Sequence, residues 1–247
     1  APDTGTFNIH SPFGDEQNVG LGLSVVNDRI GPTQETYFDV SFSYSINTSD
    51  DGRLSFGLNG GGSLLDIKYS ELSAYNNGDV LLQSDIDNKF SPQIGAVVYY
   101  RNAYKWYLGL SAPRILNTDY NTSNDFAALE RISYYFTGGY VIDLNKSIKL
   151  KPAFLVKGTN GAPLSYDLTA NFLFNEKFWL GGSYRINEQT AAIGGIVDFQ
   201  ISRQLRIGYA YEKPISDIAS YTSGTHEILL IYEFKFLSSK LKSPRYF

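Results

Sequence analysis

The chain has 247 residues and a formal net charge of −4, and it contains no cysteine, which excludes disulfide bonds, cysteine metal sites and thiol catalysis. The charge is small and no basic cluster is interleaved with aromatic residues, so we expect no nucleic-acid partner. No run approaches about eighteen apolar residues, which argues against a helical membrane protein. By contrast, 19 Tyr, 16 Phe and 23 Gly suit closely packed strands.

The N-terminal part of the chain predicts short alternating strands separated by turns. Strands are expected at residues 6–10, 18–26 and 37–46, and residues 27–34 are predicted to be a loop. The sequence Asp50-Asp51-Gly52 predicts a hairpin turn. A further strand begins at Leu54 and continues into Gly60, Gly61 and Gly62. In residues 37–46 the predicted outward row is Phe38, Val40, Phe42, Tyr44 and Ile46, and the predicted inward row is Asp39, Ser41, Ser43 and Ser45.

The middle and the end of the chain repeat this pattern with longer connections. Long loops are expected at residues 70–89, 112–130 and 213–224. The remaining strands are predicted at residues 90–100, 105–111, 131–142, 147–157, 166–174, 178–185, 190–199, 203–212 and 225–236.

The hairpin at residues 166–185 is the clearest example of the pattern. Tyr166, Leu168, Ala170 and Phe172 share one parity, and polar residues hold the other, which is typical of a strand with one apolar face. Each arm has about nine to eleven residues, the length that a tilted strand needs to cross a bilayer. A soluble β-sandwich shows the same alternation, but its strands average about five or six residues.

The lengths of the connections favour a membrane barrel over a sandwich. Tight and longer connections mostly alternate along the chain, as in outer-membrane barrels with short periplasmic turns and longer extracellular loops. We therefore predict an all-β fold, an antiparallel transmembrane β-barrel of the outer membrane over residues 1–237, with a periplasmic tail at 238–247. Thirteen strands are counted, and single-chain bacterial barrels close with an even number. We expect one strand upstream of Ala1, which makes fourteen.

Few residues suggest a metal, catalytic or phosphate-binding site. His10 and His226 are the only histidines, and their positions on the predicted strands separate them by about the height of the membrane band, so we expect no shared metal site. A hydrolase that uses His226 with a nearby serine stays a candidate, although no nucleophile elbow accompanies it. The glycine clusters lie inside predicted strands with no helix after them, which favours bends or close packing over phosphate loops.

The charges of the predicted inward parity are mixed. Basic and acidic side chains on the same face indicate internal ion pairs and an occluded interior. A wide non-selective pore is the alternative. The basic members are Lys149, Lys151, Lys157, Arg185 and Arg206, and the acidic members are Asp39, Asp167, Asp198, Glu212, Glu227 and Glu233.

Several strings in order along nearly the whole chain carry a resemblance to a known family. They are NVGLGLSVVNDRIGP (18–32), LSFGL (54–58), YLGLS (107–111), LKPAFLV (150–156), GAPLS (161–165), ANFLF (170–174), LGGSYR (180–185), IGYAY (207–211) and SPRYF (243–247). Together they resemble the PorP/SprF family of outer-membrane proteins in the type IX secretion system of Bacteroidota. Family members carry an upstream segment with a further strand, in line with the expected fourteenth strand.

The resemblance implies a non-enzymatic β-barrel, without cofactor or metal. It would help to export or retain cargo proteins that bear a C-terminal sorting domain, in some members gliding adhesins, and it would contact other secretion components. A transport channel for hydrophobic substrates, or a porin, is the alternative. We predict cargo contacts on the extracellular rim, because family residues there fall on a loop. These candidates are Asn27, Asp28, Arg29, Pro32, Pro214 and Asp217. In the basic tail, Lys240, Lys242 and Arg245 are candidates for a periplasmic partner, with a solvated chain end as the alternative.

Overall fold

The computed structural model describes residues 3–13, 18–71, 85–103, 105–116, 131–220 and 222–234. Over these residues the protein is an antiparallel sheet with two short 3-10 turns, η1 (Tyr69–Glu71) and η3 (Asp217–Ser220). Its strands are β1 (Asp3–Phe13), β2 (Val19–Ile30), β3 (Thr33–Asn47), β4 (Gly52–Ile67), β5 (Ile86–Asn102), β6 (Trp106–Ala112), β7 (Ser133–Tyr140), β8 (Ile142–Asp143), β9 (Ile148–Thr159), β10 (Ser165–Phe174), β11 (Phe178–Ile186), β12 (Ala191–Gln200), β13 (Leu205–Pro214) and β14 (Thr225–Tyr232).

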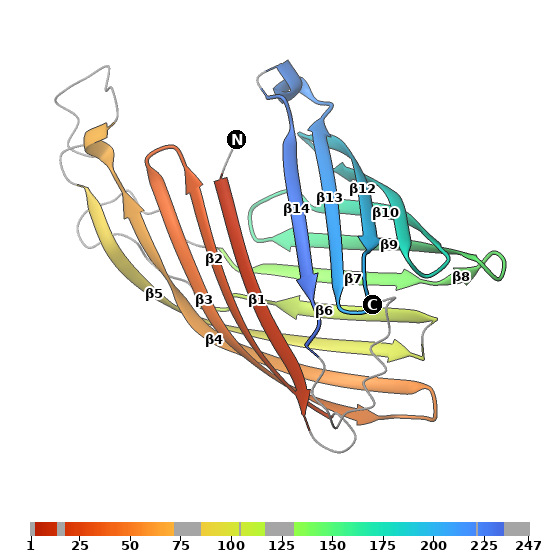
Figure 1. Cartoon of the computed structure of the whole chain (residues 1–247). Helices are drawn as coiled ribbons and strands as arrows, with labels where there is room; N and C mark the ends of the chain where they lie inside the picture. The colour runs from red at the N-terminus through yellow and green to blue at the C-terminus, as the bar shows by residue number, and fades with distance from the viewer. Residues whose placement is uncertain are drawn as a thin grey trace. The chain divides into compact units, whose positions relative to one another are not determined.

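Consecutive strands pair along the chain (Figure 1). The hydrogen-bonded order runs from β1 to β14 in sequence order, and only the two-residue β8 lies off this path, where it pairs with β9. Thirteen of the strands in the described residues lie on the path, in agreement with the predicted thirteen. This up-and-down antiparallel order is consistent with the predicted barrel. In the described residues, no helix is long and apolar enough to cross a membrane.

The chain divides into two compact units, each of which is described by itself. The first unit comprises residues 1–46, 54–98 and 111–134, and the second comprises residues 47–53, 99–110 and 135–247.

In the first unit, β3 shows how side chains divide between the two faces. The predicted outward row is the exposed one, with Phe38 at 38% and Val40 at 61% exposure. The polar residues between them, from Asp39 to Ser45, are less exposed than this row. The predicted assignment of faces is therefore confirmed, and the exposed face is the apolar one, the reverse of a soluble domain.

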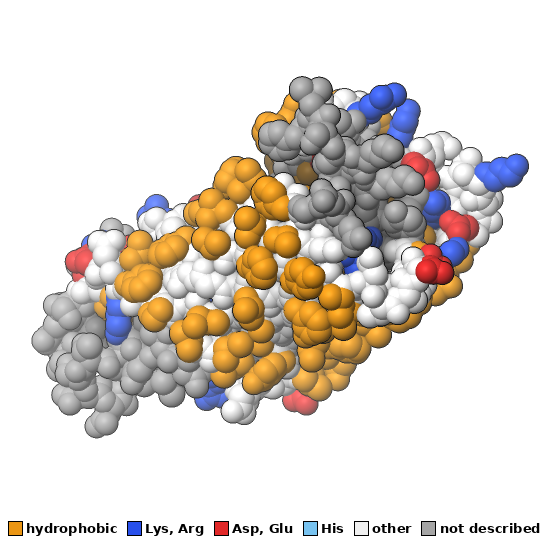
Figure 2. All heavy atoms as spheres, turned by 90° about the horizontal axis from the view of Figure 1, so that it is seen from below, with side chains coloured by type: hydrophobic (Ala, Val, Ile, Leu, Met, Phe, Trp, Pro, Cys, Tyr) orange, Lys and Arg blue, Asp and Glu red, His pale blue; other side chains and the backbone are white. Residues whose placement is uncertain are grey.

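The second unit repeats this inversion in the β10–β11 hairpin. Leu168 is 52% exposed and Leu180 is 45% exposed, whereas Asp167 and Thr169 are partly covered. Exposed hydrophobic side chains spread over much of the face in Figure 2, with charged side chains mainly toward its margins. An exposed apolar face, present in each unit, indicates contact with something other than water.

Several predicted boundaries are wrong, and the largest error concerns the loop predicted at 27–34. There β2 continues to Ile30 and β3 begins at Thr33, so the connection is the two-residue turn Gly31-Pro32. Asn27 pairs with Gly5 on one side and with Thr36 on the other. The polar composition had suggested a loop, but backbone pairing does not require apolar side chains.

Other strands are longer than predicted. The strand β1 includes Pro12 and Phe13, where the missing N–H of Pro12 is tolerated near the end of a strand with one paired neighbour. The strand β5 begins at Ile86, inside the predicted loop of residues 70–89. In the opposite direction, β14 ends at Tyr232, before the predicted end of that strand.

Candidate functional site

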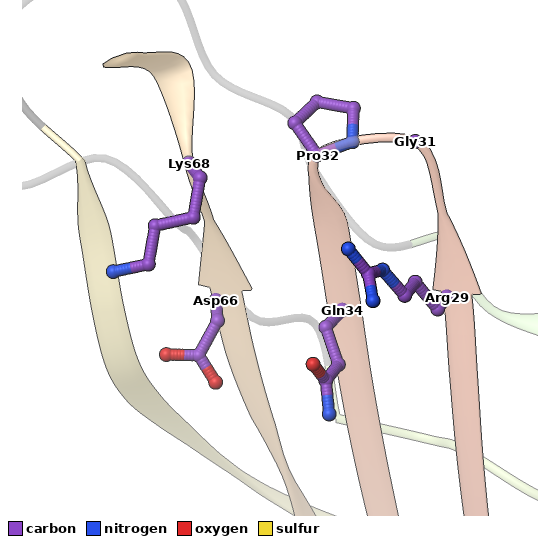
Figure 3. A pocket seen from close by; sticks show the side chains of 6 residues that line it. All are labelled: Arg29, Gly31, Pro32, Gln34, Asp66 and Lys68. Carbon is purple, nitrogen blue, oxygen red and sulfur yellow. The ribbon is translucent and has the colours of Figure 1, made fainter. Parts of the chain in front are cut away.

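The described part of the first unit contains a small cavity at the ends of β2, β3 and β4 (Figure 3). Its volume is about 250 Å³, and it is lined by Arg29, Gly31, Pro32, Gln34, Asp66 and Lys68. Gly31 has a φ of 58°, which the tight turn requires and which glycine adopts without strain. The backbone N–H of Lys68 donates to the carbonyl of Pro32 at 3.0 Å, and this bond holds the end of β4 against the turn.

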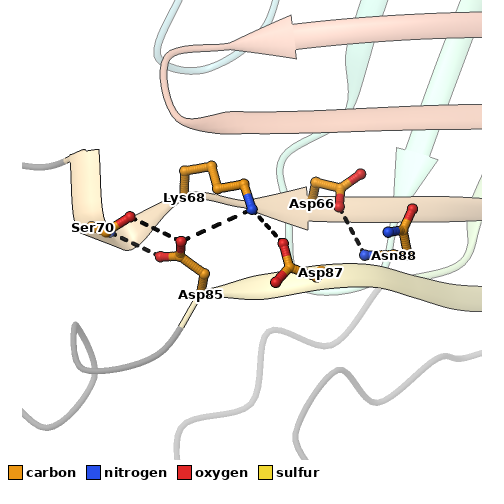
Figure 4. A network of polar contacts seen from close by, with 6 residues as sticks. All are labelled: Asp66, Lys68, Ser70, Asp85, Asp87 and Asn88. Carbon is orange, nitrogen blue, oxygen red and sulfur yellow. Dashed lines mark hydrogen bonds and ion pairs between the residues drawn. The ribbon is translucent and has the colours of Figure 1, made fainter.

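A polar network extends from this cavity to the start of β5 (Figure 4). The ammonium of Lys68 forms ion pairs with Asp87 and, at 4.0 Å, with Asp85. Asp85 accepts hydrogen bonds from the N–H and the hydroxyl of Ser70, both at 2.9 Å. Asp66 accepts a hydrogen bond from the N–H of Asn88 at 2.8 Å. The network ties together the two ends of the connection between β4 and β5.

The charges of this network lie outside the strands or at their ends and are solvated. The hydrogen bonds from Ser70 lower the pKa of the Asp85 carboxyl. The hydrogen bond with Asp87 raises the pKa of Lys68. Both shifts favour the charged forms of Asp85 and Lys68.

The predicted contact residues of the first unit have two different roles. Asn27 donates to the hydroxyl of Thr36 at 2.7 Å, and Asp28 accepts from the hydroxyl of Thr4 at 2.7 Å, so both tie β2 to a neighbouring strand. Arg29 is exposed and lines the cavity with Pro32. The prediction that Asn27, Asp28 and Arg29 lie on a loop is wrong, because all three belong to β2.

The site lies where the exposed apolar row gives way to polar residues. On β3, Phe38 belongs to that row, and Thr36 and Gln34 continue the same parity toward the turn. Arg29 is directly opposite Gln34 in the β2–β3 ladder, so these two side chains share that face. A polar cluster that continues an exposed apolar face is the expected arrangement at the boundary between lipid and water.

The other predicted contact residues lie elsewhere. Pro214 ends β13, opposite Ala192, and Asp217 begins η3, and both belong to the second unit. Lys240, Lys242 and Arg245 lie outside the described residues. Gln34, Asp66, Lys68 and Asp85 were not predicted to be contact residues. Gln34 and Asp85 lie in predicted loops, and no local sequence signal connects them with Asp66 and Lys68.

The two histidines have different surroundings. His10 lies on β1, opposite Gly22. The Nδ1 atom of His226 is 2.7 Å from the hydroxyl of Tyr209, and its ring lies 4.8 Å from that of Tyr211. The imidazole is thus engaged by a phenol and an aromatic ring. Within the described ranges, no group of three His, Asp or Glu side chains is arranged to hold a metal ion.

Ion pairs lie on the polar face of the second unit. Arg185 pairs with Asp167 on β10 at 2.5 Å and with Glu212 on β13 at 2.8 Å. Arg206 lies 3.3 Å from Asp198, whose side chain is 12% exposed. The predicted ion pairs on this face are confirmed for these five side chains.

Comparison with known proteins gives one clear relationship. The family model described as type IX secretion system membrane protein PorP/SprF matches residues 1–232. No curated protein matches the chain.

Proposed function

Because the chain belongs to the PorP/SprF family of type IX secretion system membrane proteins, we propose that it is an outer-membrane accessory barrel of that system. It assists the export or the surface anchoring of cargo proteins with a C-terminal sorting domain, gliding adhesins among them, and has no enzymatic role. The observation that carries the proposal is the family match over residues 1–232, on a sheet whose apolar face is exposed and so suited to lipid.

In the proposed orientation the longer connections face the cell exterior and the C-terminal tail faces the periplasm. The connection from β4 to β5 and the cavity beside it then belong to the extracellular rim. The cavity offers a cation without an ion pair in the described residues, Arg29, and it is also lined by Asp66 and Lys68. Such a site suits an extended peptide with an acidic group. Pro214 and Asp217 are proposed rim contacts of the second unit, and Lys240, Lys242 and Arg245 are proposed contacts of a periplasmic partner.

The test replaces Arg29 and Pro32 together, as Arg29→Gln with Pro32→Ala, in the producing cells. We expect cargo at the cell surface to fall severalfold while the barrel itself stays at its normal level in the outer membrane. The matched control is Arg101→Gln, which removes an arginine that does not line this cavity, one residue before the end of β5. Unchanged cargo retention, with normal barrel levels, would show that this rim does not contact cargo.

A second candidate, a transport channel, is supported by the polar face of the second unit with its charged side chains. Single-channel conductance of the purified protein in planar bilayers separates the two functions. A stable open pore favours the channel, and the absence of single-channel currents favours the accessory role. Ester or peptide turnover that His226→Ala abolishes would contradict the non-enzymatic proposal.

A further inference from the structure

Three neighbouring turns of the second unit each carry one exposed basic residue. The turns are residues 144–147 before β9, 175–177 between β10 and β11, and 201–204 between β12 and β13 (Figure 1). Their basic residues are Lys146, Lys177 and Arg203, which we call the basic row, and all three side chains are exposed. The three turns lie at one end of the paired strands β9 to β13.

Backbone hydrogen bonds hold this row in place. The N–H of Asn175 donates to Ser147 at 2.7 Å, and the N–H of Gln200 donates to Lys177 at 2.8 Å, so each turn is joined to the next. Asn175 and Glu176 have φ values of 50° and 55°, as in the tight hairpin turns that match strand twist. Successive turns are two strands apart, so the three basic residues recur at roughly 10 Å intervals.

The positive charge of the row is not neutralised by its acidic neighbours. Asp143 pairs with Lys105 at 2.8 Å, and Glu176 pairs with Lys149 at 3.4 Å. In the described part of the chain, Lys146, Lys177 and Arg203 form no ion pair. The turns at the other end of these strands, residues 160–164, 187–190 and 215–224, contain no Lys or Arg. Among the turns of these strands, the basic residues therefore lie at one end only.

The exposed apolar face begins directly beside these turns. The rings of Phe174 and Phe178, on either side of the second turn, lie 6.0 Å apart. Leu144 is 51% exposed, and Ile201, two residues before Arg203, is 54% exposed. Each turn has only three or four residues, so its basic side chain stays close to the apolar boundary. In a membrane protein this is the level of the lipid headgroups.

We propose that the basic row binds the phosphate groups of anionic phospholipids in the leaflet at this end of the strands. The charge is complementary, and the apolar surface beside it suits the acyl chains. An acidic protein surface is the competing partner, but the tight turns project too little to favour it over the lipid. In the proposed orientation this leaflet is the periplasmic one.

The experiment measures lipid binding to the full chain, purified in a neutral detergent. Phosphatidylglycerol and phosphatidylcholine are titrated at 50 mM and 500 mM salt, and bound lipid is counted by native mass spectrometry. The wild type should prefer phosphatidylglycerol, and this preference should weaken at high salt. Neutralising one basic residue should lower the affinity for phosphatidylglycerol about fivefold, and K146Q/K177Q/R203Q should lower it at least tenfold.

The control is K213Q, which removes an exposed lysine at the other end of β13 and should leave the preference unchanged. If the triple variant does not fold, the three single variants and the salt dependence of the wild type decide the question. Equal binding of both lipids by the wild type would overturn the proposal. A triple variant that keeps its preference for phosphatidylglycerol would also overturn the proposal. If that variant instead loses an acidic protein that co-purifies with the wild type, the basic row binds a protein and not lipid.

Discussion

The polar faces of the two units are built from different residues. In the first unit, small residues predominate: β3 contributes Ser41, Ser43 and Ser45, and β4 contributes Ser55, Gly57 and Gly61 to this face. In the second unit, long charged side chains pair across strands, as Arg185 does with Asp167 and Glu212. Small residues allow backbones to approach closely, whereas ion pairs fill space with side chains. The first face should therefore be sensitive to added volume and the second to the loss of a charge.

The largest expected effect is that of a methyl group at Gly61. A Cβ there would lie 1.9 Å from the carbonyl oxygen of Phe38, a backbone atom that yields only if β3 moves. We expect Gly61→Ala to lower the free energy of unfolding by about 3 kcal/mol. Urea unfolding in lipid vesicles, followed by tryptophan fluorescence, measures this loss.

The adjacent Gly60 provides a matched control, because a Cβ there meets nothing within 4 Å. Gly60→Ala should change the free energy of unfolding by less than about 0.5 kcal/mol. In the second unit, a Cβ at Gly181 would meet mainly the flexible side chain of Asn171. If Gly61→Ala and Gly60→Ala lower the free energy of unfolding by the same amount, close backbone approach does not make the first unit sensitive to added volume.

The next largest effect concerns charge in the second unit. Arg206→Gln removes the partner of Asp198, a carboxylate with 12% side-chain exposure. We expect a loss of about 2 kcal/mol, because a mostly covered carboxylate then lacks its counter-charge. The double variant with Asp198→Asn should recover most of the loss. An additive double variant would mean that the two side chains do not interact energetically.

Hydroxyl groups should contribute differently in the two units. The hydroxyls of Ser63 and Ser91 in the first unit are fully buried and have no hydrogen-bond partner in the part of the chain described. Ser63→Ala should therefore be neutral or stabilising by up to about 1 kcal/mol. In the second unit, Thr137 donates to the carbonyl of Phe154 at 2.9 Å, and Thr137→Val should cost about 1 kcal/mol. The same urea unfolding measures both, and a destabilised Ser63→Ala would contradict the first expectation.

The smallest effect is the acid titration of the polar network beside the cavity of the first unit. Because Ser70 lowers the pKa of Asp85 in the folded state, this carboxylate adds stability above its ordinary pKa. That stability is lost as pH falls through the lowered value. We expect Ser70→Ala to raise the pKa of Asp85 toward its ordinary value, as followed by carbon-13 NMR of the carboxyl group. An unchanged titration would show that the hydroxyl of Ser70 does not stabilise the anion.

The sequence predicted the faces of the strands better than their ends. The outward row of β3, from Phe38 to Ile46, is confirmed because alternation is a local property of each strand. The loop predicted at 27–34 is wrong, because Asn27 and Asp28 are polar yet bond to Thr36 and Thr4 on the neighbouring strands. Of the six residues that line the cavity, the sequence predicted two as contact residues. Arg29 and Pro32 were selected for their family string, whereas Asp66 and Lys68 carried no local signal.

By itself, the sequence determined the class of fold and the side on which each strand is apolar. The alternation of apolar and polar residues can be recognised from neighbouring residues alone. The absence of cysteine and the many aromatic residues further limit the possible fold classes. Only the tertiary structure decided which residues meet, such as Lys68 with the turn at Pro32 and Lys177 with the end of β12. These contacts depend on strand register, which hydrogen bonds between distant segments set and which no short stretch of sequence contains.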